Sequence, residues 1–100
     1  MERIVFAERQ IFRSIDLEVF IGNLAYETSE EEVMALCSPF GEVTRIFIPF
    51  DRALDRPRGY AFVTFSDSAA GEAAIKGLNG TIVHGRGLRV NRGTKTHRLF

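Results

Sequence analysis

Residues 58–65 read RGYAFVTF, with aromatic and aliphatic side chains in alternation. This spacing indicates a β-strand, because successive residues of a strand point to opposite faces of the sheet. Ala61 and Val63 are then expected to face a core, while Tyr60 and Phe62 share the opposite face. Two rings on the side away from the core are unusual, and they indicate a binding surface.

A second segment, residues 19–24 (VFIGNL), repeats this pattern. Phe20 lies between two aliphatic residues, so its ring is expected to point away from the core that they enter. If the two strands are neighbours, Phe20 joins Tyr60 and Phe62 in one aromatic surface. Nucleobases stack on such surfaces, and with Arg58 at the edge the pattern favours a single-stranded nucleic acid as the ligand.

The two segments together resemble the paired motifs of the RNA recognition motif family. Every position of RGYAFVTF fits the family octapeptide, which is Lys/Arg, Gly, Phe/Tyr, Gly/Ala, Phe, Val, any residue and Phe/Tyr. The resemblance covers about residues 17–93. It implies an RNA-binding domain in which Phe20 and Tyr60 each lie under a base. Phe62 would then contact the sugar between them, and Arg58 a phosphate.

Strand phase adds further candidates on the same face. The predicted RNA-binding residues are Phe20, Tyr60, Phe62, Arg58, Arg45, Phe47, Arg89, Asn91 and Arg92. Arg45 and Arg89 could read base edges or phosphates, and Asn91 could donate to a base. For Phe47, a dimer contact or a position beneath a loop is an equally good interpretation.

Patterns along the remaining chain predict the order strand, helix, strand, strand, helix, strand. The strands are expected at 17–22, 43–48, 58–65 and 88–91, with helices between Ser29 and Gly41 and between Asp67 and Gly80. This order predicts an α+β fold of the ferredoxin-like βαββαβ type. Two helices cover one face of a four-stranded antiparallel sheet, and the other face stays open.

Local signals support these elements. Ser29 and Glu32 match a capping box, and Asp67 is a second N-cap candidate. Residues 51–57 are a polar, hairpin-like connection, and residues 81–83 are a candidate extra strand.

Strand and helix periodicity also assigns individual side chains to faces. Val43, Ile46 and Ile48 are expected to line the inner side of the second strand. Glu18 is expected to point outward, and Ala73 to join the packing face of the second helix.

Composition is that of one small globular domain, with 100 residues of which 45% are hydrophobic and 26% charged. No apolar run approaches the roughly 18 residues of a membrane span, so no membrane partner is expected. Glu2 and Glu8 are unlike a targeting segment, which predicts an intracellular protein, cytoplasmic or nuclear. No cofactor or metal is expected, because His84 and His97 lack partners at ligand spacing, and the single Cys37 is interpreted as a core residue.

The net charge of zero hides an asymmetry. Residues 1–44 contain three arginines against nine acidic residues, and residues 45–100 contain ten lysines and arginines against four acidic residues. The basic run is Arg86, Arg89, Arg92, Lys95 and Arg98. Whether these groups share a face depends on the fold, and a shared face would suit a phosphate backbone.

Three regions are assigned: an N-terminal extension of uncertain structure (1–16), an RNA recognition motif (17–93) and a basic tail (94–100). The extension is expected either to pack on a sheet edge or a second copy, giving a weak homodimer, or to be unstructured. The tail either folds over bound RNA or remains solvated. The main partner expected is single-stranded RNA, with single-stranded DNA bound more weakly.

Two other functions are compatible with this arrangement. A protein-interaction module would bind a peptide or partner protein through its helices, and the acidic residues 30–32 suit that role. An acyl-phosphate hydrolase can have the same topology, but it needs an arginine beside a positioned asparagine. No arginine neighbours Asn23 in the sequence, and no Ser–His or His–carboxylate arrangement is apparent, so no enzyme is expected.

Overall fold

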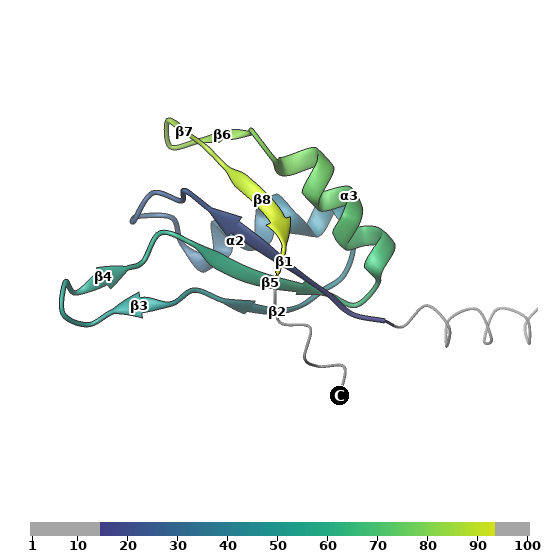
Figure 1. Cartoon of the computed structure of the whole chain (residues 1–100), viewed down its shortest axis with the longest axis horizontal. Coiled ribbons are helices and arrows are strands. Elements are labelled where there is room, and N and C mark those ends of the chain that lie inside the picture. The colour runs from purple at the N-terminus through teal and green to yellow at the C-terminus, as the bar shows by residue number, and fades with distance from the viewer. Residues whose placement is uncertain (1–14, 94–100) are drawn as a thin grey trace, which may run out of the picture.

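The computed structural model describes residues 15–93. Its main sheet has four antiparallel strands in the spatial order β2-β5-β1-β8. These strands are β1 (Leu17–Gly22), β2 (Val43–Phe47), β5 (Ala61–Phe65) and β8 (Arg89–Arg92). The helices are α2 (Glu30–Cys37) and α3 (Ser68–Leu78), and a 3₁₀ turn (Ser38–Phe40) follows α2. The predicted ferredoxin-like βαββαβ fold is confirmed (Figure 1).

Two small hairpins extend from this framework. Strands β3 (Phe50–Asp51) and β4 (Arg56–Pro57) form the connection between β2 and β5, and β6 (Ile82–Val83) pairs with β7 (Arg86–Gly87) before β8. The predicted hairpin-like connection and the extra strand are therefore both present. In the described part of the chain, no helix is long and apolar enough to cross a membrane.

Both helices begin at the predicted caps. The amide of Glu32 donates to Ser29 Oγ at 3.1 Å, and the Ser29 amide donates back to Glu32 Oε1 at 2.9 Å, which completes the capping box. Asp67 Oδ1 accepts from the Ala69 amide at the start of α3. These contacts satisfy amides that have no partner within the helix.

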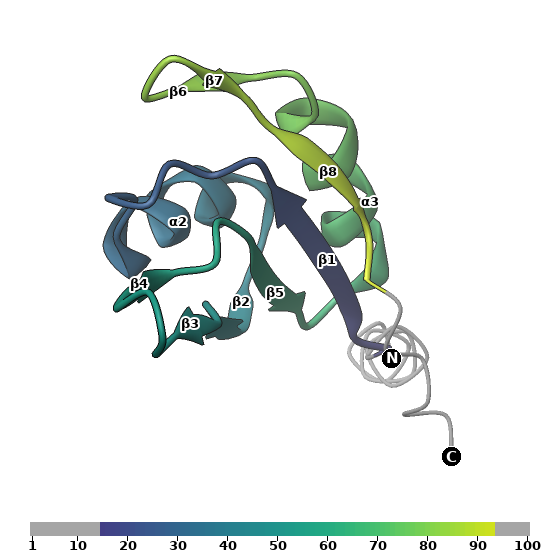
Figure 2. The ribbon, with the colours of Figure 1, turned by 60° about the vertical axis from the view of Figure 1, so that its left-hand side comes forward.

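The core lies between the helices and the inner face of the sheet (Figure 2). Its largest buried side chains alternate along the two central strands: Val19 and Ile21 on β1, and Val63 and Phe65 on β5. Cys37 is also fully buried, as predicted, and burial raises the pKa of its thiol to about 11.

A bulge in β2 explains the uneven spacing of its inner residues. Val43 pairs with Phe65 and Arg45 with Thr64, so Thr44 is an extra residue on this strand. Val43 and Ile46 can therefore both pack against the core although they are three residues apart.

One prediction about a side chain is right in its face but not in its exposure, and another is wrong. Glu18 lies opposite Thr64 on the outer face of the sheet, as predicted, but it is buried because the chain at Gly93 lies against its carboxylate. Ala73 was expected on the packing face of α3, but it is exposed. Gly71 takes that place, because its missing side chain lets α3 approach Leu17.

Candidate nucleic-acid interface

Three aromatic rings lie together on the uncovered face of the sheet. The ring centroids of Phe20 and Tyr60 are 5.6 Å apart, those of Phe20 and Phe62 5.6 Å, and those of Tyr60 and Phe62 5.9 Å. All three side chains are partly exposed, whereas the residues between them on the strands are buried. The sequence prediction that these rings share the open face is confirmed in its geometry, and we call Phe20, Tyr60 and Phe62 the ring cluster.

No two rings of the cluster are parallel. The interplanar angle is 37° between Phe20 and Tyr60, 59° between Phe20 and Phe62, and 85° between Tyr60 and Phe62. Edge-to-face contact is one of the favourable arrangements of neighbouring rings, and the pair Tyr60–Phe62 adopts it. A flat ligand can therefore lie on one ring at a time and meets the next ring at an angle.

The ring cluster belongs to a row that crosses all four strands. Phe47 pairs with Phe62, Phe62 with Phe20, and Phe20 with Asn91. Side chains that are directly opposite in a sheet are neighbours on one face. Phe47, which is 48% exposed, and Asn91 therefore extend the uncovered surface to both edges of the sheet, as the strand phase predicted.

Gly22 sets the position of the Phe20 ring. A Cβ atom at Gly22 would lie 2.7 Å from Phe20 Cε2 and 2.9 Å from Cζ, which is closer than Cβ atoms approach other heavy atoms in real structures, so the ring would have to move. Residues 20 and 22 of a strand share a face, so only glycine leaves this space to the ring.

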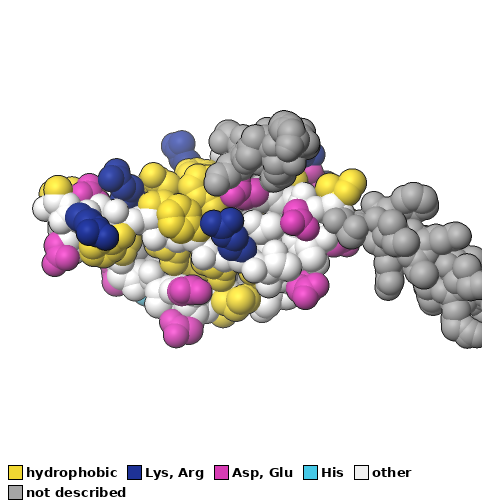
Figure 3. Space-filling view, turned by 90° about the horizontal axis from the view of Figure 1, so that it is seen from below, with side chains coloured by type: hydrophobic (Ala, Val, Ile, Leu, Met, Phe, Trp, Pro, Cys, Tyr) yellow, Lys and Arg dark blue, Asp and Glu magenta, His cyan; other side chains and the backbone are white. Residues whose placement is uncertain are grey.

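Three exposed arginines lie around the ring cluster. Arg45 on β2, Arg58 before β5 and Arg89 on β8 are all exposed. In register, Arg45 lies opposite Thr64 and Arg89 opposite Gly22, so both occupy positions on the open face. In Figure 3, hydrophobic side chains gather on the surface between Lys or Arg side chains.

Two other arginines of the predicted basic run are held by this chain's own groups. Arg92 forms an ion pair with Glu72 of α3, although it also lines a hollow of about 320 Å³ with Phe20, Phe62 and Asn91. Arg86 donates to Asn23, from Nε to the backbone oxygen at 3.2 Å and from Nη2 to Oδ1 at 2.7 Å.

The basic run therefore does not act as one patch among the described residues, and Lys95 and Arg98 lie outside them. An arginine does neighbour Asn23 in space, which sequence reasoning missed because the two residues are 63 positions apart. Both contacts go to oxygens of Asn23 itself, so this arginine connects the β6–β7 hairpin to the loop after β1.

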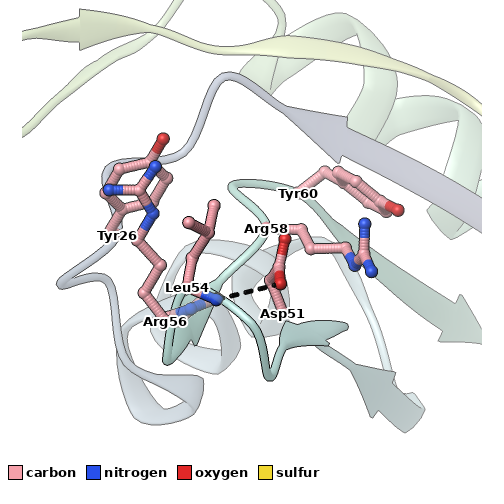
Figure 4. Close-up of a pocket in the computed structure, with 7 residues that line it drawn as sticks. Tyr26, Asp51, Leu54, Arg56, Arg58 and Tyr60 are labelled. Carbon is pink, nitrogen blue, oxygen red and sulfur yellow. Dashed lines mark hydrogen bonds between the residues drawn. The ribbon is translucent and has the colours of Figure 1, made fainter.

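A pocket that the sequence did not predict lies beside the ring cluster (Figure 4). It has a volume of about 170 Å³, and we call it the hairpin pocket. Its walls are formed by Tyr26, Asp51, Leu54, Arg56, Arg58 and Tyr60, among others. The guanidinium of Arg56 lies 4.2 Å from the centroid of the Tyr26 ring. No periodic pattern marks Tyr26 or Arg56 in the sequence, because both are in loops or short strands.

The opposite side of the domain has different chemistry. His84 Nε2 lies 3.0 Å from Glu32 Oε2, so the histidine does have an acidic partner that its sequence neighbours did not reveal. The hydrogen bond from the Ser29 amide, and then the imidazole of His84, lower the pKa of the Glu32 carboxyl. The described residues contain no group of three His, Cys, Asp or Glu side chains that could hold a metal ion.

The fold and the site define a class of protein: a single α+β domain with helices on one face of the sheet and an aromatic, arginine-flanked surface on the other. Comparison with known proteins gives the family. The family model of the RNA recognition motif matches residues 19–89, and the chain belongs to this family.

Relatives and solved structures agree with the family. "Putative RNA-binding protein RbpF" of Nostoc is 40% identical over 76 residues, which cover 76% of this chain and 72% of that protein. "Glycine-rich RNA-binding protein 3, mitochondrial" of Arabidopsis thaliana is 39% identical over 74 residues, covering 74% of this chain and 24% of that protein. The Rna15 RRM solved with bound RNA (GU) matches with a TM-score of 0.70 and 32% identity, over 77% of this chain and 82% of that one.

Proposed function

We propose that this chain binds short single-stranded RNA on the open face of its sheet. The observation that carries the proposal is the ring cluster, in which three partly exposed rings lie with centroids 5.6 to 5.9 Å apart on the face that the helices leave uncovered. Membership of the RNA recognition motif family and relatives named as RNA-binding proteins support it.

The geometry favours a single strand over a duplex. The faces of paired bases are already stacked within a double helix, whereas the bases of a single strand can turn outward and stack on protein rings. Because the three rings are mutually tilted, successive bases must change direction as they cross the cluster. A flexible single strand can follow such a surface.

Arginine contacts to phosphate supply the electrostatic part of binding. Arg45, Arg58 and Arg89 are exposed around the rings, and each can donate a forked pair of hydrogen bonds to a phosphate. Three neutralised phosphates give a slope of about −2 for log affinity against log salt concentration.

The expected affinity follows from the free energy of base stacking and the cost of ordering the strand. Stacking contributes about 1–3 kcal/mol per base, and the ring cluster has room for two or three bases. After the cost of ordering the strand, a dissociation constant on the order of 1 μM is expected.

The acidic residues at the start of α2 have a structural role that weakens the case for a helix-bound partner. Glu30, Glu31 and Glu32 occupy the first turn, where negative charge stabilises the helix dipole. Glu32 also completes the capping box. Their presence therefore does not require a protein partner.

The test is selection of RNA from a random-sequence pool, with the wild-type chain and with the double variant Phe20→Ala, Tyr60→Ala. The wild type should enrich defined sequences and the double variant should not. Phe50→Ala is the matched control, because Phe50 is an exposed ring outside the cluster. Equal enrichment by a correctly folded double variant would contradict the proposal.

A further inference from the structure

The hairpin pocket lies at the end of the ring cluster, where the chain after β1 meets the β3–β4 hairpin. Tyr26 stands on one side of the pocket, Arg58 and Tyr60 stand on the other, and Leu54 lies between them (Figure 4). Tyr60 belongs to both surfaces, since its ring also contacts those of Phe20 and Phe62. A strand that crosses the ring cluster toward Tyr60 therefore reaches this pocket next.

The pocket combines flat, apolar and charged walls. Arg56 lies over the Tyr26 ring at 4.2 Å, a cation–π contact that holds the guanidinium in place while its edge can still donate hydrogen bonds. Leu54 is 56% exposed and offers an apolar surface. Asp51 Oδ1 accepts from the Leu54 amide at 3.2 Å, and the carboxylate has capacity for further donors.

These walls select a class of ligand by chemistry. A bare phosphate would suit Arg56 and Arg58 but would be repelled by Asp51. An apolar side chain of a peptide would suit Leu54 but would leave the charged groups without partners. A nucleobase has flat faces together with hydrogen-bond donors and acceptors along one edge, and it matches all of these groups.

We propose that the hairpin pocket binds one further nucleotide of the RNA strand that the ring cluster binds. The inference rests on the proposed function and extends its footprint beyond the sheet. Asp51 accepts a hydrogen bond from the base, and Arg56 donates to an acceptor on the edge of the same base, while Arg58 keeps its contact to the phosphate beside the ring cluster. The pocket is thus a specificity element built by the segment after β1 and the β3–β4 hairpin, outside the four-stranded sheet.

The experiment begins with the RNA that the wild-type chain selects. This oligonucleotide is shortened one nucleotide at a time from each end, and the affinity of each product is measured by fluorescence anisotropy. For the wild type, removal of one terminal nucleotide should weaken binding about tenfold. A tenfold loss lies in the lower part of the range of affinity that the stacking of one base contributes. Arg56→Gln should lack this step and bind the full-length and shortened RNAs equally.

Two further variants sharpen the result. Arg52→Gln is the matched control, because this exposed arginine lies in the same hairpin but does not line the pocket, and it should keep the tenfold step. Asp51→Asn replaces an acceptor-only group with an amide that also donates, so repeated selection should give a different base at that one position.

The outcomes separate the two proposals. If Arg56→Gln keeps the tenfold step, or if the wild type shows none while still binding the shortened RNA through Phe20 and Tyr60, the pocket proposal is overturned and the proposed function stands. If the wild type enriches no RNA, both proposals are overturned.

Discussion

The two faces of the central strands show how one stretch of chain makes both a core and a binding surface. On β1 and β5, Val19, Ile21 and Val63 are fully buried, whereas Phe20 and Phe62 alternate with them and remain partly exposed. The backbone is the same for both sets, so the difference comes from strand phase and from the helices that cover only one face. Aliphatic residues on the inner face stabilise the fold, and rings on the outer face are available to a ligand.

The largest expected effect is a loss of stability, and it should differ between two phenylalanines on β5. Phe65 is fully buried, so Phe65→Ala should lower the free energy of unfolding by about 3–5 kcal/mol, as a cavity in the core does. Phe62→Ala removes the same atoms from the open face and should cost only about 1 kcal/mol of stability. Chemical denaturation measures both, and equal losses of stability would contradict the assignment of the two faces.

The next effect concerns the space beside Phe20. Gly22→Ala should push the ring out of position, because the new methyl group would meet it at 2.7 Å. We expect RNA affinity to fall about fivefold, equivalent to losing about 1 kcal/mol of one stacking contact, with the fold retained. Gly87→Ala is the control, since its Cβ would meet no atom closer than 3.7 Å. An unchanged affinity for Gly22→Ala would show that the position of this ring is unimportant.

Salt dependence separates the electrostatic part of the open face from the stacking part. Arg58→Gln should change the slope of log affinity against log salt from about −2 to about −1.3, since one phosphate contact to a single strand contributes about −0.7. Arg52→Gln should leave the slope at its wild-type value. A slope that is already near zero for the wild type would contradict phosphate contacts altogether.

The smallest effects belong to the covered side of the domain. Ser29→Ala should cost about 1 kcal/mol of stability through the lost cap, without changing RNA affinity. Glu32→Gln keeps an acceptor for the Ser29 amide but removes the charge beside His84. RNA affinity measured in parallel should be unaffected, because these residues lie away from the ring cluster.

The Glu32 contribution should depend on pH with a defined sign. The pKa of this carboxyl is lowered from its ordinary value of 4.5 in the folded state, first by the Ser29 amide and then by His84. Its contribution to stability is therefore complete above pH 4.5 and is lost as the pH falls through the lower, folded-state pKa. The stability difference between wild type and Glu32→Gln should shrink over that range, and a difference that grows on acidification would refute this sign.

The sequence predicts the fold and the ring cluster because both depend on local periodicity. Alternation in residues 17–22 and 58–65 assigns each side chain to a face, and the capping sequences at Ser29 and Asp67 locate the helices. The inner positions of Val43 and Ile46 were predicted, but the β2 bulge that allows both was not, because it is visible only in the pairing with β5.

What the sequence does not predict are the contacts between distant segments. Arg86 with Asn23 and His84 with Glu32 are separated by 63 and 52 residues, and no local pattern connects them. The hairpin pocket joins Tyr26 to a hairpin around residue 54 for the same reason. The N-terminal extension, its proposed homodimer contact and the basic tail remain predictions, because residues 1–14 and 94–100 lie outside the described structure.

The most direct test of the account is a nuclear magnetic resonance titration of the wild-type chain with the selected RNA. We predict that the signals of Phe20, Tyr60 and Phe62 shift together, while the signals of α2 and α3 stay in place. Shifts confined to the two helices, with the ring signals unchanged, would contradict RNA binding on the open face and would point to the helices as the binding surface.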